Sequence, residues 1–203
     1  MRCFPIFIDL HGTDVIIIGH GRQTEEKIAR LAPFCPNIRL FAKDVFSPPA
    51  STHVELIRRP FTADDLSPAP AFVLVTDTEE EEASDIYRLC VERGIPVNVA
   101  DRPALCTFYF PSLISRGALS IGISTNGQSP AAAGLLRQHI ENALPDSIEE
   151  ILDWAQSLRL RLKEEISSPQ KRRELIKALT AMAMKLDRPL SEAEVNQVLF
   201  QTE

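Results

Sequence analysis

Short hydrophobic runs recur along the first half of the chain, separated by turn residues and by segments with helical periodicity. Runs of this kind that are apolar throughout are typical of strands buried on both faces of a parallel sheet. The predicted strands cover residues 1–10, 15–18, 38–42, 54–58, 71–75 and 96–100, and helices are predicted at 23–33 and 79–93. Strands and helices that alternate in this order predict a parallel, doubly wound α/β sheet.

The pattern changes after residue 112. Residues 119–124 alternate apolar and small polar side chains, which predicts a half-buried antiparallel strand. Ser129 and Pro130 then begin a helix that runs to about residue 144, with the serine as its cap. After Pro145 the chain is predicted to be wholly helical. Three parts result: a sheet domain at 1–112, a strand–helix module at 113–145 and a C-terminal helical domain at 146–203.

Capping residues and periodicity define the helices of the last part. Ser147 with Glu150, and Ser191 with Glu194, have the spacing of a capping box, in which the two side chains satisfy each other's backbone amides. Another helix begins near residue 168. Its inward face is predicted to carry Leu175, Ile176, Leu179, Met182 and Leu186.

The first buried strand ends in a glycine turn, Gly19-His20-Gly21, and a helical pattern follows at once. Strand, glycine turn and helix in this order form the first part of a nucleotide-binding βαβ unit. The backbone amides at the start of such a helix are unpaired and attract an anion such as a pyrophosphate. A lone G-x-G is weak evidence, because glycine turns after strands are often only turns. With its flanking strand and helix, the turn favours a nucleotide site.

Other polar residues follow the carboxyl ends of the predicted strands, where a ligand of such a sheet binds. Asp44 lies 25 positions after Gly19, near the place where dinucleotide folds hold the ribose hydroxyls. Lys43 beside it favours a 2′-phosphate instead, so the choice between NAD and NADP stays open, and a solvated turn is the plain alternative. Asp101 follows the strand at 96–100, where an aspartate accepts a proton or binds a divalent cation. The alternative is that Asp101 caps the turn into Pro103 or pairs with Arg102.

A polar loop at 124–130 lies between the strand at 119–124 and the helix that Pro130 begins. Its hydroxyls and free amides are suited to binding carboxylates, and Arg116 and Arg137 flank the same module. The plain alternative is a turn with a helix cap.

Composition narrows the class of protein. The chain has 203 residues, 44% of them hydrophobic and 25% charged, which is ordinary for a soluble globular protein. Its net charge of −6 argues against non-specific nucleic-acid binding and against an anionic membrane surface. No signal-peptide pattern and no membrane-spanning apolar run is found, and the four cysteines form no Cys-x-x-Cys pair. A reduced, cytoplasmic protein without cysteine-bound metal is therefore expected.

Taken together, the motifs resemble the precorrin-2 dehydrogenase / sirohydrochlorin ferrochelatase family, which includes the N-terminal half of bifunctional siroheme synthases. The resemblance covers nearly the whole chain and rests on the order and spacing of six segments. They are residues 4–10, 15–21 with Lys27, 75–77, 98–103, 105–112 and 123–130.

The resemblance implies an NAD-dependent oxidation of precorrin-2 to sirohydrochlorin by a Rossmann-type domain at 1–112. In some members Fe²⁺ or Co²⁺ is then inserted. It also implies a homodimer built through a dimerisation module at 113–145, with the active site in a cleft beside the sheet domain.

The resemblance also assigns residues. Asp101 matches the aspartate proposed for general-base work and for metal insertion, and Thr125 lies where several members carry a serine. The expected cofactor-binding residues are Gly19, Gly21, Arg22, Gln23, Lys43, Asp44 and Thr76. A tetrapyrrole with many carboxylates needs arginines and exposed amides, and the expected substrate-binding residues are Arg102, Arg116, Ser124, Thr125, Asn126, Gly127 and Arg137.

The glycine turn departs from the family's pattern. His20 stands where the family has its middle glycine, Gln23 where it has an apolar residue, and Thr24 where it has a small one. Thr24 is expected to push the helix from the strand, and Gln23 to reach the phosphate site. Altered cofactor binding keeps two alternatives open: a chelatase without the redox cofactor, and a non-catalytic tetrapyrrole- or nucleotide-binding module.

Overall fold

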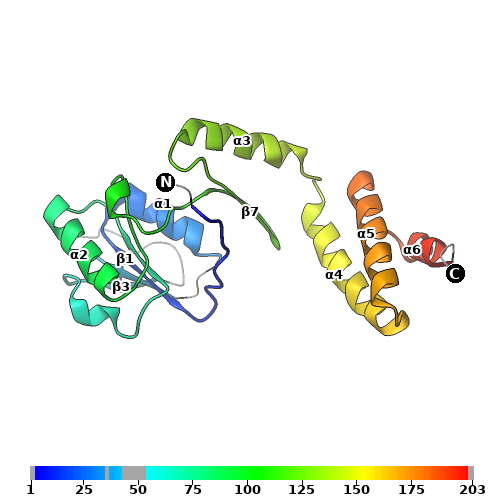
Figure 1. Cartoon of the computed structure of the whole chain (residues 1–203), viewed down its shortest axis with the longest axis horizontal. Helices are drawn as coiled ribbons and strands as arrows, with labels where there is room; N and C mark the ends of the chain where they lie inside the picture. The colour runs from blue at the N-terminus through cyan, green and yellow to red at the C-terminus, as the bar shows by residue number, and fades with distance from the viewer. Residues whose placement is uncertain (1–2, 35–36, 43–53, 201–203) are drawn as a thin grey trace. The chain divides into compact units, whose positions relative to one another are not determined.

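A computed structural model describes residues 3–34, 37–42 and 54–200 of the chain. The chain divides into two compact units, which Figure 1 shows in colours that run along the chain. Cys3–Phe110 forms the sheet unit, and Pro111–Glu203 forms the hairpin–helix unit. The predicted fold class, a Rossmann-type parallel sheet followed by a strand–helix module and C-terminal helices, is confirmed. The finer division at residues 112 and 145 stays a prediction.

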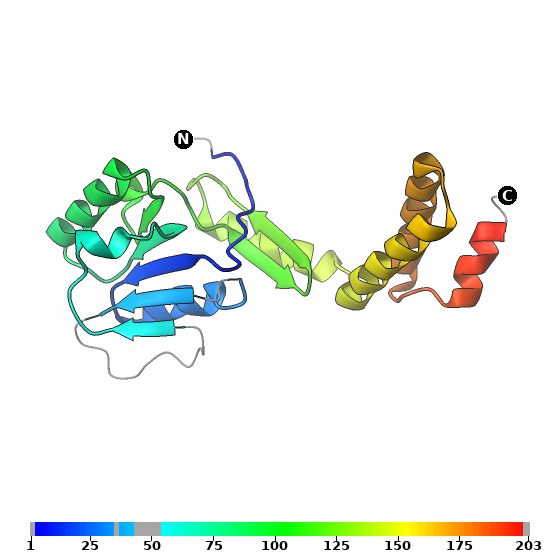
Figure 2. The same ribbon diagram turned by 90° about the horizontal axis from the view of Figure 1, so that it is seen from below.

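The sheet unit contains a parallel sheet with the strand order β3-β2-β1-β4-β5, visible in Figure 2. The chain runs outward from β1 in one direction and then returns to add β4 and β5 on the other side. This reversal leaves a crevice beyond the carboxyl ends of β1 and β4, the place where such sheets bind ligands. The strands are β1 (Asp14–Ile18), β2 (Asn37–Phe41), β3 (Val54–Ile57), β4 (Phe72–Val75) and β5 (Val97–Val99).

One predicted strand is wrong. The described residues of 1–10, which are residues 3–10, form no strand. Phe4 and Phe7 are 86% and 78% exposed, and of the apolar side chains that suggested a strand Leu10 is the one buried among the described residues. Residues 3–10 cannot pair with the next strand, β1, because β1 already pairs with β2 on one side and with β4 on the other.

Alternate residues of each strand pack against helices on opposite faces of the sheet. Ile16 and Ile18 of β1 belong to the cluster that includes α2 (Glu80–Glu92), whereas Val15 and Ile17 belong to the cluster that includes α1 (Gly21–Leu31). The apolar runs of the sequence are explained by burial on both faces. Short 3₁₀ turns, η1 (Ala63–Leu66) and η2 (Pro103–Leu105), complete this unit.

The hairpin–helix unit begins with two antiparallel strands, β6 (Ser112–Arg116) and β7 (Leu119–Ile123). The antiparallel strand predicted at 119–124 is confirmed, while its partner β6 was not predicted. Gly117 makes the turn between them with φ +54. The helix predicted after Ser129 is α3 (Pro130–Ala143), and the Ser129 side chain caps it by accepting a hydrogen bond from the Ala132 amide.

Three further helices form a small core of their own: α4 (Ile148–Glu165), α5 (Pro169–Leu186) and α6 (Glu192–Phe200). Leu175 and Leu179 are buried and Ile176 is partly buried, as predicted. Met182 and Leu186 are instead 40% and 48% exposed, and Ala183 is buried between them in sequence. Within the described ranges, no helix is long and apolar enough to span a bilayer.

The two predicted capping boxes have different outcomes. Ser191 and Glu194 form theirs, since the Ser191 amide donates to Glu194 Oε2 at 2.8 Å and the Glu194 amide donates to Ser191 Oγ at 3.4 Å. The box at Ser147 is wrong. The Ser147 amide donates instead to the carboxylate of Asp187, at 2.9 Å, and the Ser147 side chain makes no capping hydrogen bond.

Candidate functional site: the glycine turn and the carboxyl edge of the sheet

The glycine turn follows the carboxyl end of β1 and packs tightly against the end of β4. Gly19 has φ +137, and a Cβ placed there would lie 2.0 Å from the carbonyl oxygen of Thr76. Such a distance is far below van der Waals contact, so only glycine allows the two strand ends to approach. Gly21 also has a positive φ, of +76, which glycine adopts without steric cost.

The N-terminus of α1 is open to an anion. The helix begins at Gly21, and the side chain of the N-cap residue His20 makes no capping hydrogen bond. The first turn contains no acidic side chain. The first N–H groups of a helix have no intrahelical acceptor, and the helix dipole makes them favourable for negative charge. These features fit the pyrophosphate of a dinucleotide.

Thr24 is accommodated by a hydrogen bond between α1 and the end of β4. Its side chain is buried, and its hydroxyl donates to the His20 carbonyl oxygen at 2.8 Å. The hydroxyl oxygens of Thr24 and Thr76 lie 2.6 Å apart. Because the Thr24 proton is used by His20, the Thr76 hydroxyl donates to Thr24. The residue expected to push the helix from the strand thus bonds the helix to the neighbouring strand end.

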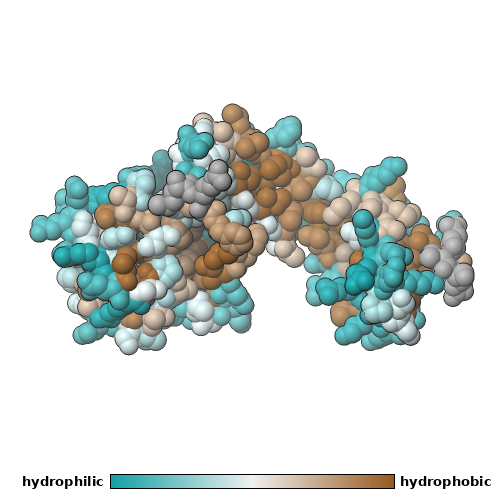
Figure 3. Space-filling view, in the orientation of Figure 1, coloured by the Kyte–Doolittle hydropathy of each residue, from teal (hydrophilic) through white to brown (hydrophobic). Residues whose placement is uncertain are grey.

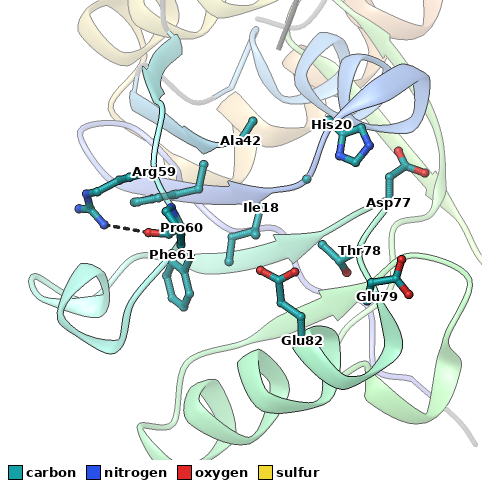
Figure 4. Close-up of a pocket in the computed structure, with 12 residues that line it drawn as sticks. Ile18, His20, Ala42, Arg59, Pro60, Phe61, Asp77, Thr78, Glu79 and Glu82 are labelled. Atoms are coloured by element: carbon teal, nitrogen blue, oxygen red, sulfur yellow. Dashed lines mark hydrogen bonds between the residues drawn. The ribbon is translucent and has the colours of Figure 1, made fainter. Parts of the chain in front are cut away.

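A cavity of about 230 Å³ lies beside the glycine turn, at the carboxyl ends of β1 and β2 (Figure 4). Its apolar walls come from the strand ends and from the segment after β3. Its polar side carries three carboxylates, two from the segment that joins β4 to α2 and one from the first turn of α2. The residues that matter here are Ile18, Phe41, Ala42 and Phe61 on the apolar walls, and His20, Asp77, Glu79 and Glu82 on the polar side.

Arg59 also lines this cavity, but its guanidinium is held by other groups. It donates to both carboxylate oxygens of Asp65, at 2.8 and 2.5 Å, and to the Pro60 carbonyl oxygen. The hydrogen bonds from Arg59, followed by those from Thr62, hold the pKa of Asp65 well below its usual range. The carboxylates Asp77, Glu79 and Glu82 therefore set the charge that the cavity offers a ligand.

Asp101 follows β5 at the same edge of the sheet. It adopts a left-handed backbone conformation with φ +61, and its side chain is exposed. Its Oδ2 accepts a hydrogen bond from Nε2 of Gln23 at 2.8 Å. The expected alternative, a local pair with Arg102, is not formed, because the Arg102 guanidinium donates to the carbonyl oxygens of Thr78 and Glu79.

Lys27 lies one helical turn after Gln23, with its ammonium 4.4 Å from the centre of the Phe110 ring. Burial lowers the pKa of Lys27, and the nearby cation Arg30 lowers it further, while Asp101 raises it. The interaction with the ring is a cation–π contact. α1 therefore presents an amide and an ammonium toward the neighbourhood of Asp101.

The polar loop of the hairpin–helix unit is closed by its own hydrogen bonds. The Thr125 hydroxyl donates to the Ser129 carbonyl oxygen at 3.0 Å and accepts from the Ser129 amide at 3.2 Å. The Ser124 hydroxyl oxygen accepts from the Asn126 amide, and Asn126 and Gly127 both have positive φ. The plain alternative of a well-built turn is therefore realised, and it still exposes Asn126 and Gly127.

The three arginines expected to bind carboxylates each have partners in the protein. Arg102 holds the segment after β4, as described above. Arg116 donates to the carbonyl oxygens of Pro145 and Asp146, and Arg137 pairs with Glu141 on its own helix. The contacts of Arg102 and Arg116 tie separate segments together, whereas that of Arg137 lies within one helix. In each case a substrate carboxylate would have to share the guanidinium or replace its partner.

Two segments of the chain match models of known protein families. The model described as "Putative NAD(P)-binding" matches residues 6–112, more than half of the chain. The chain belongs to this family. The model described as "Sirohaem biosynthesis protein central" matches residues 116–143, which span β7 and α3. The resemblance drawn from the motifs is confirmed by these matches together with the relatives below.

Curated relatives and a solved structure are similar to the chain over most of its length. Siroheme synthase 1 of Pectobacterium atrosepticum is 34% identical over 177 residues, which are 85% of this chain and 37% of that protein. Siroheme synthase of Thioalkalivibrio sulfidiphilus is 31% identical over 185 residues, 85% of this chain and 36% of that protein. The chain thus spans little more than a third of these relatives. The structure of SirC, precorrin-2 dehydrogenase, has a TM-score of 0.77 at 20% identity and covers 98% of both chains, which shows a shared fold.

The structure brings some predicted site residues together and adds others. Thr76 contacts Gly19 in the glycine turn, Gly21 of the same turn lies beside Asp77, and Gln23 meets Asp101. Arg22 lies on the outer face of α1 and pairs with Glu26. Lys43 and Asp44 lie outside the described residues. In the part of the chain that is described, no group of three His, Cys, Asp or Glu side chains is placed to hold a metal ion.

Sequence reasoning missed the acidic wall of the cavity. The sequence places residues 79–82 only at the start of the helix predicted at 79–93, and neither they nor Asp77 were assigned to the cofactor site. Their position after a buried strand was the available signal, because the carboxyl ends of parallel strands share one edge.

Proposed function

We propose that this chain oxidises precorrin-2 to sirohydrochlorin in siroheme biosynthesis, with NAD as the acceptor of the hydride. The observation that carries the proposal is the hydrogen bond between Gln23 and Asp101. It joins the first turn of the cofactor-binding helix to the carboxylate expected to act as base. One edge of one sheet therefore carries both the anion site and the base, in a chain with siroheme synthases among its relatives.

The chemistry divides between cofactor and protein. Bound NAD would accept the hydride from the macrocycle. Asp101, exposed at the sheet edge, would accept the accompanying proton, because its Oδ1 is not the oxygen that Gln23 occupies. Holding both reactants at one edge removes much of the entropic cost of bringing them together. The backbone amides of the first turn of α1, with Gly19, Gly21 and Thr76 behind them, would bind the pyrophosphate.

The cavity beside the turn favours NAD over NADP. Asp77, Glu79 and Glu82 can accept hydrogen bonds from ribose hydroxyls, whereas they repel an additional phosphate. Arg59, a cation on the cavity wall, is engaged by Asp65. Calorimetric titration of the protein with NAD and with NADP tests this preference. Tighter binding of NADP would contradict it.

The tetrapyrrole would be bound by the polar loop at Ser124, Thr125, Asn126 and Gly127, with Arg102, Arg116 and Arg137 supporting its carboxylates. Insertion of Fe²⁺ or Co²⁺ into the product would use Asp101 as the group that accepts the displaced protons. The loop as tetrapyrrole site and Asp101 as proton acceptor are both tested by incubating the protein with sirohydrochlorin and each metal ion without NAD, and by following formation of the metallated product.

The active form is a cytoplasmic homodimer in this proposal. Leu135 and Leu136 of α3 are 68% and 48% exposed. Figure 3 shows hydrophobic side chains gathered over the region of α3 and β7. Exposed apolar patches of this kind mark interaction surfaces. Light scattering coupled to gel filtration should give twice the mass of the chain, and a monomer over the whole concentration range would refute the dimer.

The function is tested by incubating the purified protein with precorrin-2, with and without NAD, and following the absorbance spectrum of sirohydrochlorin. We expect product only with NAD. Asp101→Asn should lower the rate about 100-fold or more, as expected for loss of a general base. Asp64→Asn, an exposed aspartate of η1, is the matched control and should keep the rate of the unaltered protein. A rate of sirohydrochlorin formation that NAD does not change would refute the dehydrogenase. The chelatase would then be tested separately, with sirohydrochlorin and the metal ion.

A further inference from the structure

The side-chain carboxylate of Asp101 is exposed, and a single side-chain hydrogen bond to it is present among the described residues. That bond comes from Gln23, 78 residues earlier in the chain, with 2.8 Å between Nε2 and Oδ2. An exposed carboxylate rotates easily about its last side-chain torsion. A hydrogen bond from a helix fixes that rotation and presents the second oxygen in one direction.

Two cations near Asp101 are engaged elsewhere. Arg102, the next residue, donates to the carbonyl oxygens of Thr78 and Glu79. The ammonium of Lys27 lies over the Phe110 ring and acts on Asp101 through its charge at longer range. The amide of Gln23 is thus the group placed to orient Asp101 directly.

Gln23 is itself well anchored. It lies in the first turn of α1, and the next residue, Thr24, is buried and hydrogen-bonded to both His20 and Thr76. This part of the helix is therefore fixed to the ends of β1 and β4. A donor carried by such an anchored turn holds its acceptor in a defined place, which is what proton transfer requires of a base.

We propose that Gln23 is a positioning residue for Asp101, and that it acts through this carboxylate rather than through the phosphates of the cofactor. The proposal rests on the proposed function for its catalytic consequence. It replaces the expectation from sequence that the Gln23 side chain reaches into the phosphate site. It also gives a purpose to a polar residue where the resembled family has an apolar one.

The test compares Gln23→Leu, which keeps the size of the side chain but removes the amide, with Glu25→Gln on the exposed face of the same helix. For Gln23→Leu we expect kcat to fall about tenfold, which is part of the roughly 100-fold or greater contribution of a well-placed base, because Asp101 itself is still present. The KM for precorrin-2 should stay the same, and the calorimetric dissociation constant for NAD should change by less than about twofold. Glu25→Gln should match the unaltered protein in all three.

A double-mutant cycle gives the specific signature. In the Asp101→Asn background, Gln23→Leu should cause no further loss of kcat, because the residue acts through the carboxylate that is no longer there. Gln23→Glu should lower kcat at least as much as Gln23→Leu, since it places two carboxylates side by side.

An NMR measurement that needs no turnover separates this proposal from the proposed function. The side-chain amide NMR resonances of Gln23 should shift in Asp101→Ala and stay in place in Glu25→Gln. If the unaltered protein fails to oxidise precorrin-2 but these resonances shift, the function is refuted while the contact stands. The positioning role is overturned if Gln23→Leu keeps full kcat. It is equally overturned if Gln23→Leu weakens NAD binding about tenfold, the result for a phosphate-binding residue.

Discussion

Replacing Gly19 by alanine tests the packing on which the cofactor site is built. The new Cβ would lie 2.0 Å from the Thr76 carbonyl oxygen and 2.4 Å from the Thr76 hydroxyl oxygen, and the backbone would keep a φ of +137. Strain at such a backbone conformation costs about 1–3 kcal/mol for a residue other than glycine. Overpacking against a fixed backbone costs roughly another 1–3 kcal/mol. We therefore expect Gly19→Ala to lower the free energy of unfolding of the sheet unit by about 2–6 kcal/mol.

The matched control is Gly12→Ala in the same unit. Gly12 has φ +71, but a Cβ there would meet no atom within 4 Å, so only the conformational cost of about 1–2 kcal/mol applies. Urea denaturation followed by circular dichroism gives the free energy of unfolding. Hydrogen exchange of the β1 and β4 amides shows whether the loss is local to the turn. If Gly19→Ala destabilises the protein no more than Gly12→Ala, the strand ends do not depend on the close approach and the reasoning fails.

Three further outcomes are expected. Thr24→Val leaves the Thr76 hydroxyl without its acceptor and should lower the free energy of unfolding by about 1–2 kcal/mol, whereas Thr24→Ser should not. Hydrogen bonds from Arg188, then from Ser191, lower the pKa of Glu194 to about 2. Its stabilisation is therefore complete above the unfolded value of about 4.3 and is lost as the pH falls toward 2. Urea unfolding followed by tryptophan fluorescence should show this loss, and Glu194→Gln should remove it. Burial raises the pKa of Cys90 to about 11, so a maleimide at pH 8 should label the exposed Cys3 well before Cys90, as mass spectrometry of peptides would show.

The strands of the sheet could be predicted because a strand that is buried on both faces is a continuous run of apolar residues. The stretch 71–75 is apolar throughout, and β4 (Phe72–Val75) is buried at every position. The same signal failed at Phe4 and Phe7, because apolar residues show that a segment can be buried but not that an edge of the sheet is available to it. Met182 and Leu186 failed for a related reason, since the small side chain of Ala183 lies on the buried face instead.

The contacts that define the candidate site lie far apart in sequence. Gln23 meets Asp101 across 78 residues, and Thr24 meets Thr76 across 52. Local patterns placed each of these residues at a strand end or at the start of a helix. Which of them touch depends on the order of the strands, because β1 and β4 are neighbours only after the chain has reversed its direction across the sheet. The Ser147 cap failed in the same way, because its acceptor, Asp187, lies 40 residues further along.

The central claim is that the cofactor site and Asp101 act together in one oxidation. The most direct measurement is a simultaneous recording of NADH and sirohydrochlorin absorbance during turnover of precorrin-2 by the unaltered protein. The account predicts that NADH appears in step with the oxidised macrocycle, in a constant ratio, and that both signals vanish together in Asp101→Asn. Sirohydrochlorin that forms without NADH, or an Asp101→Asn variant that retains both signals, would contradict it.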